Sequence, residues 1–235
     1  LSVATRLPVS IAWSTPGAAL LVSTGAVAGG WPAAVGAFCV VGGLVLLTAL
    51  WPRLGDLVAA IPTPIAQAML AGVLLTLCLA PVRAVVATPL LVAPVIVTWL
   101  VLLRVSPRWA APAALAVTLA IVGYEAVHGG TLAWSDAVPR LDLTAPTLSW
   151  QAVVGLAVPL YVVTMASQNV PGVAVMASFG YRVPWRETMT VTGIATLAGA
   201  TAGGHAINLA AISAALAAGP EAHPDARRRW VAAHT

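Results

Sequence analysis

Four long stretches of this sequence contain no aspartate, glutamate, lysine, arginine or histidine, and they limit the available folds more than any other feature. They cover residues 7–52, 57–82, 84–103 and 143–181. A helix that crosses a bilayer needs about 20 mostly apolar residues, so these stretches alone hold about six crossings. Only 8% of all residues are charged, against about 25% in a typical soluble domain. The sequence predicts an all-α polytopic membrane protein.

One segment inside the apolar regions is interrupted by glycines. Gly203 and Gly204 precede His205, and each glycine costs a helix about 1 kcal/mol relative to alanine. We therefore expect a short extended piece followed by a half-helix that begins near Asn208, whose side chain can cap the free N–H groups. The broken segment spans residues 200–219.

A second broken segment is expected at residues 6–29. Residues 7–14 are rich in β-formers, Thr15 is a candidate N-cap, and Pro16 suits the first helical position. A half-helix start carries about half a positive charge and attracts anions. Two interrupted segments in corresponding places suggest an inverted repeat, and such breaks mark the substrate site in many secondary transporters.

Complete crossings fill the rest of a single transmembrane transporter region that covers residues 1–235, with about eight membrane segments in all. The predicted crossings are 32–51, 62–80, 89–104, 109–128, 150–177 and 184–201.

The arginines test the orientation, because cytoplasmic loops carry an excess of positive charge. The chain has eleven basic residues, all of them arginine. If the turn at 51–56 is cytoplasmic, only Arg83 and Arg140 fall outside, and the loop from 129 to 149, with Asp136 and Asp142, is external. The other nine arginines then lie inside. The polar tail at 220–235 is therefore expected in the cytoplasm, with Arg227 to Arg229 as a membrane-surface anchor.

Polar groups at membrane depth are costly and point to function. Ser167, Gln168 and Asn169 lie midway along the 150–177 crossing, and Pro171 cannot donate to the carbonyl of Ser167. They are candidates for the wall of a polar pocket, and bonds between helices are the alternative. His205 titrates near neutrality, which suits a proton-coupled carrier. A structural histidine is the alternative there.

Several classes of function find no support. The cysteines Cys39 and Cys78 lie in apolar spans without neighbouring ligands, so we expect small core residues, no metal and no cofactor. No nucleophile elbow or paired carboxylates accompany His205, so no enzyme is expected. Arginine loops at a membrane surface explain the high pI, and no nucleic-acid partner is expected. A purely structural subunit would leave the two broken segments unexplained.

Several ordered motifs resemble the BenE-type benzoate/proton symporters, and the likeness runs along essentially the whole chain. The motifs are Pro8 to Gly17 (PVSIAWSTPG), Ala166 to Gly172 (ASQNVPG), Gly203 to Ile212 (GGHAINLAAI) and Gly219 to Asp225 (GPEAHPD).

The resemblance implies fourteen membrane segments in two inverted repeats of seven, as in the uracil and sulfate transporter superfamily. The third and tenth segments there are a short strand plus a half-helix, and they correspond to 6–29 and 200–219. The eighth corresponds to 150–177. Segments one, two and eleven to fourteen would then lie outside this chain. The chain has no initiator methionine and starts in an apolar region, so we expect a piece of a longer protein.

The implied function is import of benzoate or a similar aromatic carboxylate by proton symport, in the cytoplasmic (inner) membrane. Another small anion such as sulfate or a dicarboxylate, or a nucleobase, is the alternative. Nucleobase carriers place acidic residues where Gln168 and His205 lie, which disfavours a nucleobase. The expected partners are the carboxylate, protons and membrane lipid, and a homodimer stays open.

The substrate site is expected between the two half-helix starts and the polar middle of 150–177. His205 would carry the proton, and Tyr161, Met165 and Val170 would contact the ring. The candidate substrate-binding residues are Thr15, Pro16, Gly17, Ser167, Gln168, Asn169, Gly204, His205 and Asn208.

Overall fold

The computed structural model describes residues 1–24, 27–60, 63–129 and 142–233. It divides into two compact units, Leu1–Leu74 with Asp142–Thr235, and Leu75–Leu141. The predicted external loop falls partly outside the described residues, together with Asp136 and Arg140. The predicted start of a crossing at Pro62 also falls outside them.

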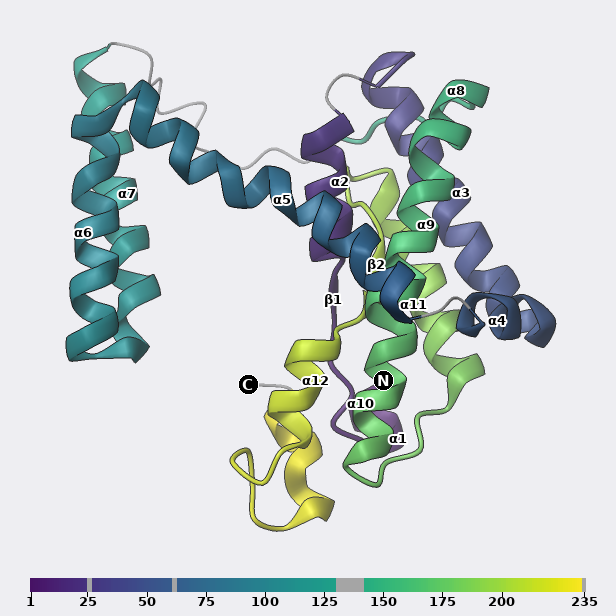
Figure 1. Cartoon of the computed structure of the whole chain (residues 1–235). Coiled ribbons are helices and arrows are strands. Elements are labelled where there is room, and N and C mark those ends of the chain that lie inside the picture. Colours follow the sequence, from purple (N-terminus) through teal and green to yellow (C-terminus); the bar gives the residue numbers. More distant parts are fainter. Residues whose placement is uncertain (25–26, 61–62, 130–141, 234–235) are drawn as a thin grey trace. The chain divides into compact units, whose positions relative to one another are not determined.

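Most of the described chain is helical (Figure 1). Among the described residues, three helices are long and apolar enough to cross a membrane: Gly30–Leu50, Pro107–His128 and Trp150–Ser178. These findings confirm the class of helical membrane protein. The elements before the second unit are α1 (Ser2–Thr5), β1 (Ile11–Trp13), α2 (Thr15–Thr24), α3 (Gly30–Leu50) and α4 (Pro52–Ala59), and α5 (Thr63–Ala87) runs into that unit.

The second unit holds two further helices, and the chain then returns to the first unit. The two are α6 (Pro89–Val105) and α7 (Pro107–His128). One long helix follows, built from α8 (Trp150–Ala152), η1 (Val153–Ala157), α9 (Val158–Thr164), η2 (Met165–Asn169) and α10 (Val170–Ser178). The last elements are α11 (Trp185–Ala200), β2 (Ile207–Leu209), α12 (Ala211–Ala218) and η3 (Ala226–Ala233).

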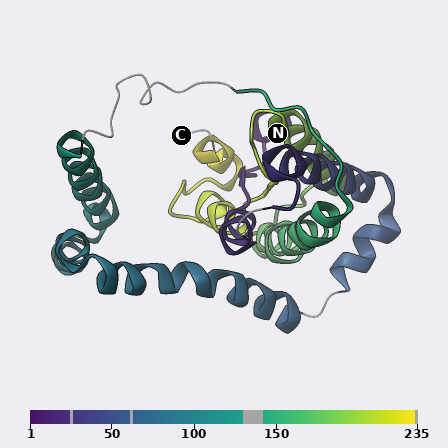
Figure 2. The same ribbon diagram turned by 90° about the horizontal axis from the view of Figure 1, so that it is seen from above.

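The two strands pair antiparallel, with Ile11 opposite Leu209, Ala12 opposite Asn208 and Trp13 opposite Ile207. A helix follows each strand, α2 after β1 and α12 after β2. Figures 1 and 2 both place the strands inside the group of helices of the first unit. Segments from opposite ends of the sequence therefore meet at one place.

Prolines set several of the helix boundaries. The residue before a proline is disfavoured in a helix, and α3, α5 and α6 all end before such a residue: Trp51, Thr88 and Ser106. The helix predicted to end at residue 80 therefore continues through Pro81 to Ala87. Arg83 therefore lies inside α5.

The long helix from residue 150 to 178 contains two π-helical turns that the sequence pattern does not predict. In η2 the N–H of Val170 donates to the carbonyl of Met165, five residues back. In η1 the N–H of Val158 donates to the carbonyl of Val153. Such turns are rare and occur frequently at functional sites.

The helices α3 and α11 pack closely through glycines. A Cβ on Gly193 would lie 2.7 Å from Cγ of Leu46 and 3.0 Å from its backbone nitrogen. A Cβ on Gly42 would lie 2.8 Å from Cγ of Leu197. Small residues at such contacts allow membrane helices to approach each other.

We expect Gly193→Ala to destabilise the protein by about 1–3 kcal/mol, because the added methyl group overpacks this contact. Thermal unfolding in detergent measures the change. Gly43→Ala is the matched control: a Cβ at Gly43 on α3 meets no atom within 4 Å. Its stability should stay equal or rise, because alanine favours a helix. Equal unfolding temperatures for the two variants would contradict the packing argument.

The polar tail is folded against the first unit. The guanidinium of Arg229 donates to the carbonyls of Ala218, at 2.9 Å, and His223, at 2.8 Å, so it satisfies the C-terminal end of α12. The hydroxyl of Tyr181 donates to the carbonyl of Ala226 at 2.8 Å. Arg229 therefore has a structural contact in addition to any role at the membrane surface.

Candidate functional site

The first strand–helix junction is held by Ser14. Its hydroxyl accepts a hydrogen bond from the N–H of Gly17 at 3.1 Å and lies 2.9 Å from the hydroxyl of Thr164 on α9. The prediction that Thr15 caps this helix is wrong by one residue, because Thr15 is already helical and Pro16 takes the second helical position. The N–H of Ser14 donates to the carbonyl of Ala206 and extends the strand pairing.

The second junction is capped by a neighbouring helix. The prediction that Asn208 caps the half-helix is wrong, because pairing with β1 keeps Asn208 extended and α12 begins only at Ala211. The side-chain oxygen of Gln168 accepts from the N–H of Ala211 at 3.3 Å. The side-chain oxygen of Asn169 accepts from the N–H of Leu209 at 2.8 Å. The π-helical turn thus directs two consecutive amides toward β2 and α12.

All three polar residues in this turn make hydrogen bonds within the protein. The hydroxyl of Ser167 donates to the carbonyl of Val163 within its own helix. Asn169 is fully buried, and its amide nitrogen lies 3.0 Å from the sulfur of Met165. Asn169 and Gln168 bond to other segments, as the alternative had it, and the bond of Ser167 stays within its own helix. Of the three, only Gln168 also lines the cavity described next.

A cavity of about 300 Å³ lies between the two strand–helix junctions, and we call it the strand–helix cavity. Four predicted site residues line it, together with five that the sequence did not single out. The predicted four are Thr15, Pro16, Gln168 and Asn208, and the others are Ala12, Trp13, Ala210, Ile212 and Ser213. All nine lining residues are uncharged, so the polarity of this cavity comes from amides, hydroxyls and helix ends.

The amide of Asn208 is the most informative group at this cavity. Asn208 is 1% exposed, and its Nδ2 has no hydrogen-bond partner among the described residues. An unpaired buried donor costs about 1–3 kcal/mol, so native proteins rarely retain one without a reason. Asn208 also lines the cavity, so an acceptor bound there is a candidate partner for this amide.

Three other predicted residues support the cavity but do not line it. A Cβ on Gly17 would lie 2.7 Å from Cδ1 of Leu160, and a Cβ on Gly204 would collide with the indole of Trp13. The imidazole of His205 stacks on the same indole, with ring centroids 5.5 Å apart and planes inclined by 30°. Trp13 also lines the cavity. His205 is therefore separated from the cavity by one side chain, the indole on which it stacks.

None of the three expected ring contacts lines the strand–helix cavity. Met165 is fully buried in the core, and the hydroxyl of Tyr161 lies 2.6 Å from the hydroxyl of Thr48 on α3. Val170 packs against the same core cluster. The apolar surface of the cavity comes instead from the strand–helix junctions, with Trp13 and Ile212 as its largest side chains.

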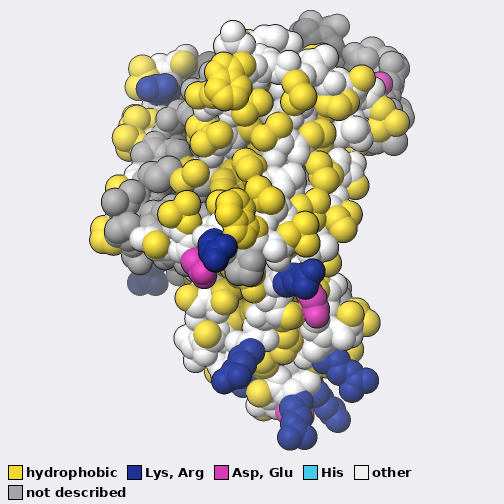
Figure 3. Space-filling model, turned by 90° about the vertical axis from the view of Figure 1, so that its right-hand side faces the viewer, with side chains coloured by type: hydrophobic (Ala, Val, Ile, Leu, Met, Phe, Trp, Pro, Cys, Tyr) yellow, Lys and Arg dark blue, Asp and Glu magenta, His cyan; other side chains and the backbone are white. Residues whose placement is uncertain are grey.

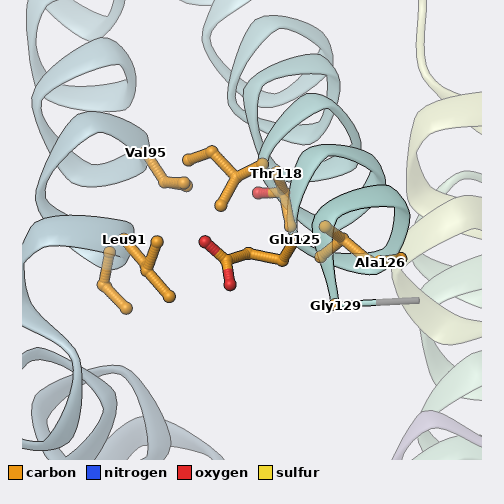
Figure 4. Close-up of a pocket in the computed structure, with 9 residues that line it drawn as sticks. Leu91, Val95, Thr118, Glu125, Ala126 and Gly129 are labelled. Atoms are coloured by element: carbon orange, nitrogen blue, oxygen red, sulfur yellow. The ribbon is translucent and has the colours of Figure 1, made fainter. Parts of the chain in front are cut away.

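A larger cavity, of about 730 Å³, lies between α6 and α7 in the second unit. Leu91 and Val95 line one side, and Figure 4 shows the carboxylate of Glu125 directed from α7 into the space between the helices. A negatively charged carboxylate at a cavity repels an anion. This cavity is therefore a poor site for an anionic ligand, and the strand–helix cavity is the better one.

Two half-helix starts that face an uncharged cavity inside a bundle of apolar helices are typical of secondary membrane transporters. Comparison with known proteins agrees with that class. The chain belongs to the BenE family, described as benzoate membrane transport protein, whose family model matches residues 1–235. The family is one of membrane transporters and not a class of enzyme.

Two curated relatives are similar along nearly the whole chain. The inner membrane protein YdcO of Escherichia coli K12 is 38% identical over 231 residues, which is 97% of this chain. The benzoate membrane transport protein of Acinetobacter baylyi is 32% identical over 239 residues, which is 99% of this chain. The alignments span only 58% of each relative's length. No solved structure matches.

Proposed function

We propose that this chain forms the substrate-binding part of a carrier that imports benzoate, or a similar aromatic carboxylate, together with a proton. The observation that carries the proposal is that Asn208 lines the strand–helix cavity and that its buried Nδ2 has no hydrogen-bond partner among the described residues. The family and the name of the Acinetobacter relative support benzoate as the first substrate to test.

The cavity offers hydrogen-bond donors and partial positive charge to a carboxylate. Two lining residues carry amide donors, Nδ2 of Asn208 and Nε2 of Gln168. The side-chain oxygen of Gln168 already accepts from the N–H of Ala211. The first turns of α2 and α12 add helix-dipole charge, about half a unit at each N-terminus. A carboxylate can therefore be held without a buried arginine.

The same cavity offers a flat apolar surface to an aromatic ring. Trp13, Pro16 and Ile212 line it, and an indole favours stacked or edge contacts with another ring. A volume of about 300 Å³ is at the small end of ligand pockets, which range from roughly 300 to 1,000 Å³. These features favour a small aromatic acid over a sulfate ion, which has no ring.

We place the two broken segments as the third and tenth of fourteen in a seven-plus-seven inverted repeat, with 150–177 as the eighth. The antiparallel pairing of β1 with β2, each followed by a helix, is compatible with a twofold relation between them. The tail at 220–235 would be cytoplasmic, in line with the arginine distribution. The name of the Escherichia coli relative supports the inner membrane.

The test is uptake of labelled benzoate by cells that express the complete reading frame, with and without a protonophore. We expect uptake that unlabelled benzoate competes and that the protonophore abolishes. Sulfate, dicarboxylates and uracil serve as competitors for the alternative substrates. Absence of uptake above empty cells, with the protein present in the membrane, would overturn benzoate as the substrate.

A further inference from the structure

Most of the exposed charge of the first unit gathers at one end. Figure 3 shows the dark blue side chains, all arginines because the chain has no lysine, concentrated at the lower end of the visible face. In Figure 1 this end carries α1 and α12. Above this end, the visible surface in Figure 3 is mainly apolar. An arginine-rich end beside an apolar surface is expected where a membrane protein leaves the lipid and enters water.

A cavity of about 580 Å³ opens at this end, and we call it the arginine cavity. Three distant parts of the chain form it: the residues around α1, the loop after α10, and η3. The lining residues are Val3, Arg6, Leu7, Tyr181, Ala226, Arg227 and Trp230. Two guanidinium groups thus share one cavity with an indole and aliphatic side chains, and no carboxylate lines it in the part of the chain that the structure describes.

The arginines around this cavity differ in what they contact. Arg229 is engaged by the backbone carbonyls at the end of α12. Arg228 lies 3.8 Å from Asp225, whose other oxygen accepts from the backbone N–H of Arg227. The carboxylate of Asp225 is therefore already in use. The side chains of Arg6 and Arg227, both exposed, remain to bind an anion at the cavity.

The backbone at Arg6 is unusual. Its φ is 53° and its ψ is 33°, and among the described residues it is the one non-glycine residue with positive φ. The left-handed conformation is unfavourable for a residue with a Cβ and occurs mainly at glycine. Here the left-handed residue ends α1, and its side chain lines the cavity. A glycine at this position would fit the backbone but would supply no guanidinium group.

We propose that the arginine cavity binds the headgroup of an anionic phospholipid. Guanidinium groups pair with phosphate oxygens, often through two parallel hydrogen bonds. Trp230 and Tyr181 are residue types that prefer the membrane–water boundary. Val3 is 64% exposed and, with Leu7, offers apolar surface to the glycerol and upper acyl region. Basic pockets of this kind at the membrane surface recognise anionic lipid headgroups.

The experiment measures lipid retention by the purified protein in a neutral detergent, by native mass spectrometry. Phosphatidylglycerol, phosphatidylcholine and water-soluble glycerol 3-phosphate are added in turn. We expect the protein to retain phosphatidylglycerol in preference to phosphatidylcholine. We also expect the double variant Arg6→Gln, Arg227→Gln to lower that preference roughly tenfold or more. Glycerol 3-phosphate should compete weakly, because it lacks the acyl chains.

The matched control removes two exposed arginines elsewhere, Arg53→Gln with Arg108→Gln, and should keep the preference. The variant Arg6→Lys, Arg227→Lys keeps the charge and should retain most of it, with circular dichroism to check the fold. An unchanged preference in the glutamine variant would overturn the proposal. An equal loss in the control variant would also overturn it, because the retention would then depend on non-specific charge. Full competition by glycerol 3-phosphate would overturn it as well, because the ligand would then be a soluble anion.

Discussion

Replacing Gln168 by glutamate is expected to lower kcat/KM for benzoate uptake at least about 100-fold, which corresponds to one or two charge-assisted hydrogen bonds. Glutamate has almost the same shape, and its oxygen can still accept from the N–H of Ala211 as Gln168 does. The start of α12 therefore stays capped. The change replaces the amide donor by a negative oxygen at the strand–helix cavity, where it would face the carboxylate of the substrate.

Gln151→Glu is the matched control for this prediction. Gln151 lies on the same long helix, is exposed, and accepts a hydrogen bond from the hydroxyl of Ser149 at 2.9 Å, which glutamate would still accept. Initial rates of labelled benzoate uptake, corrected for protein in the membrane, measure both variants. Gln151→Glu should stay near the wild-type rate. A wild-type kcat/KM for Gln168→Glu would contradict a role of the strand–helix cavity in transport.

Local sequence chemistry was sufficient to locate the elements around the cavity, because their causes are local. Paired glycines at 203 and 204 disfavour a continuous helix, and the proline at 16 suits a helix start. A short strand followed by a helix occurs in the structure at both places. The N-caps were wrong by one residue or more, because they depend on contacts with other segments. Ser14 meets Thr164, and pairing with β1 keeps Asn208 extended.

The site was predicted less well than the fold, because it too depends on contacts between distant segments. Which polar side chain faces the cavity depends on the π-helical turn at Met165–Asn169, which has no clear sequence signal. That turn directs Gln168 and Asn169 to the backbone of β2 and α12. Trp13 was missed as a cavity residue because its importance comes from its pairing position opposite Ile207 and its stacking on His205.

Replacing His205 by glutamine is expected to uncouple the movement of benzoate from the movement of the proton. This is the second of the two largest effects that we expect. One proton carried with a monovalent anion cancels its charge, so the membrane potential does no work on the pair. A pH gradient of one unit then supports about tenfold accumulation. Without the proton, a potential of 100 mV, negative inside, opposes the anion by about 2.3 kcal/mol, or roughly 50-fold. The two cases therefore differ by a factor of several hundred.

Proteoliposomes that contain the complete protein separate these cases, because the pH gradient and the potential can be imposed independently. Wild-type protein should accumulate benzoate when the interior is alkaline and should respond little to a potassium diffusion potential. His205→Gln should lose the first response and gain the second, since the half-buried imidazole stacked on Trp13 is the proton carrier that we propose. The control is His128→Gln, because His128 is exposed at the end of α7 and should behave as wild type. If His205→Gln still accumulates benzoate in response to the pH gradient alone, the proton travels by another group, and His205 then has only a structural role beside the indole.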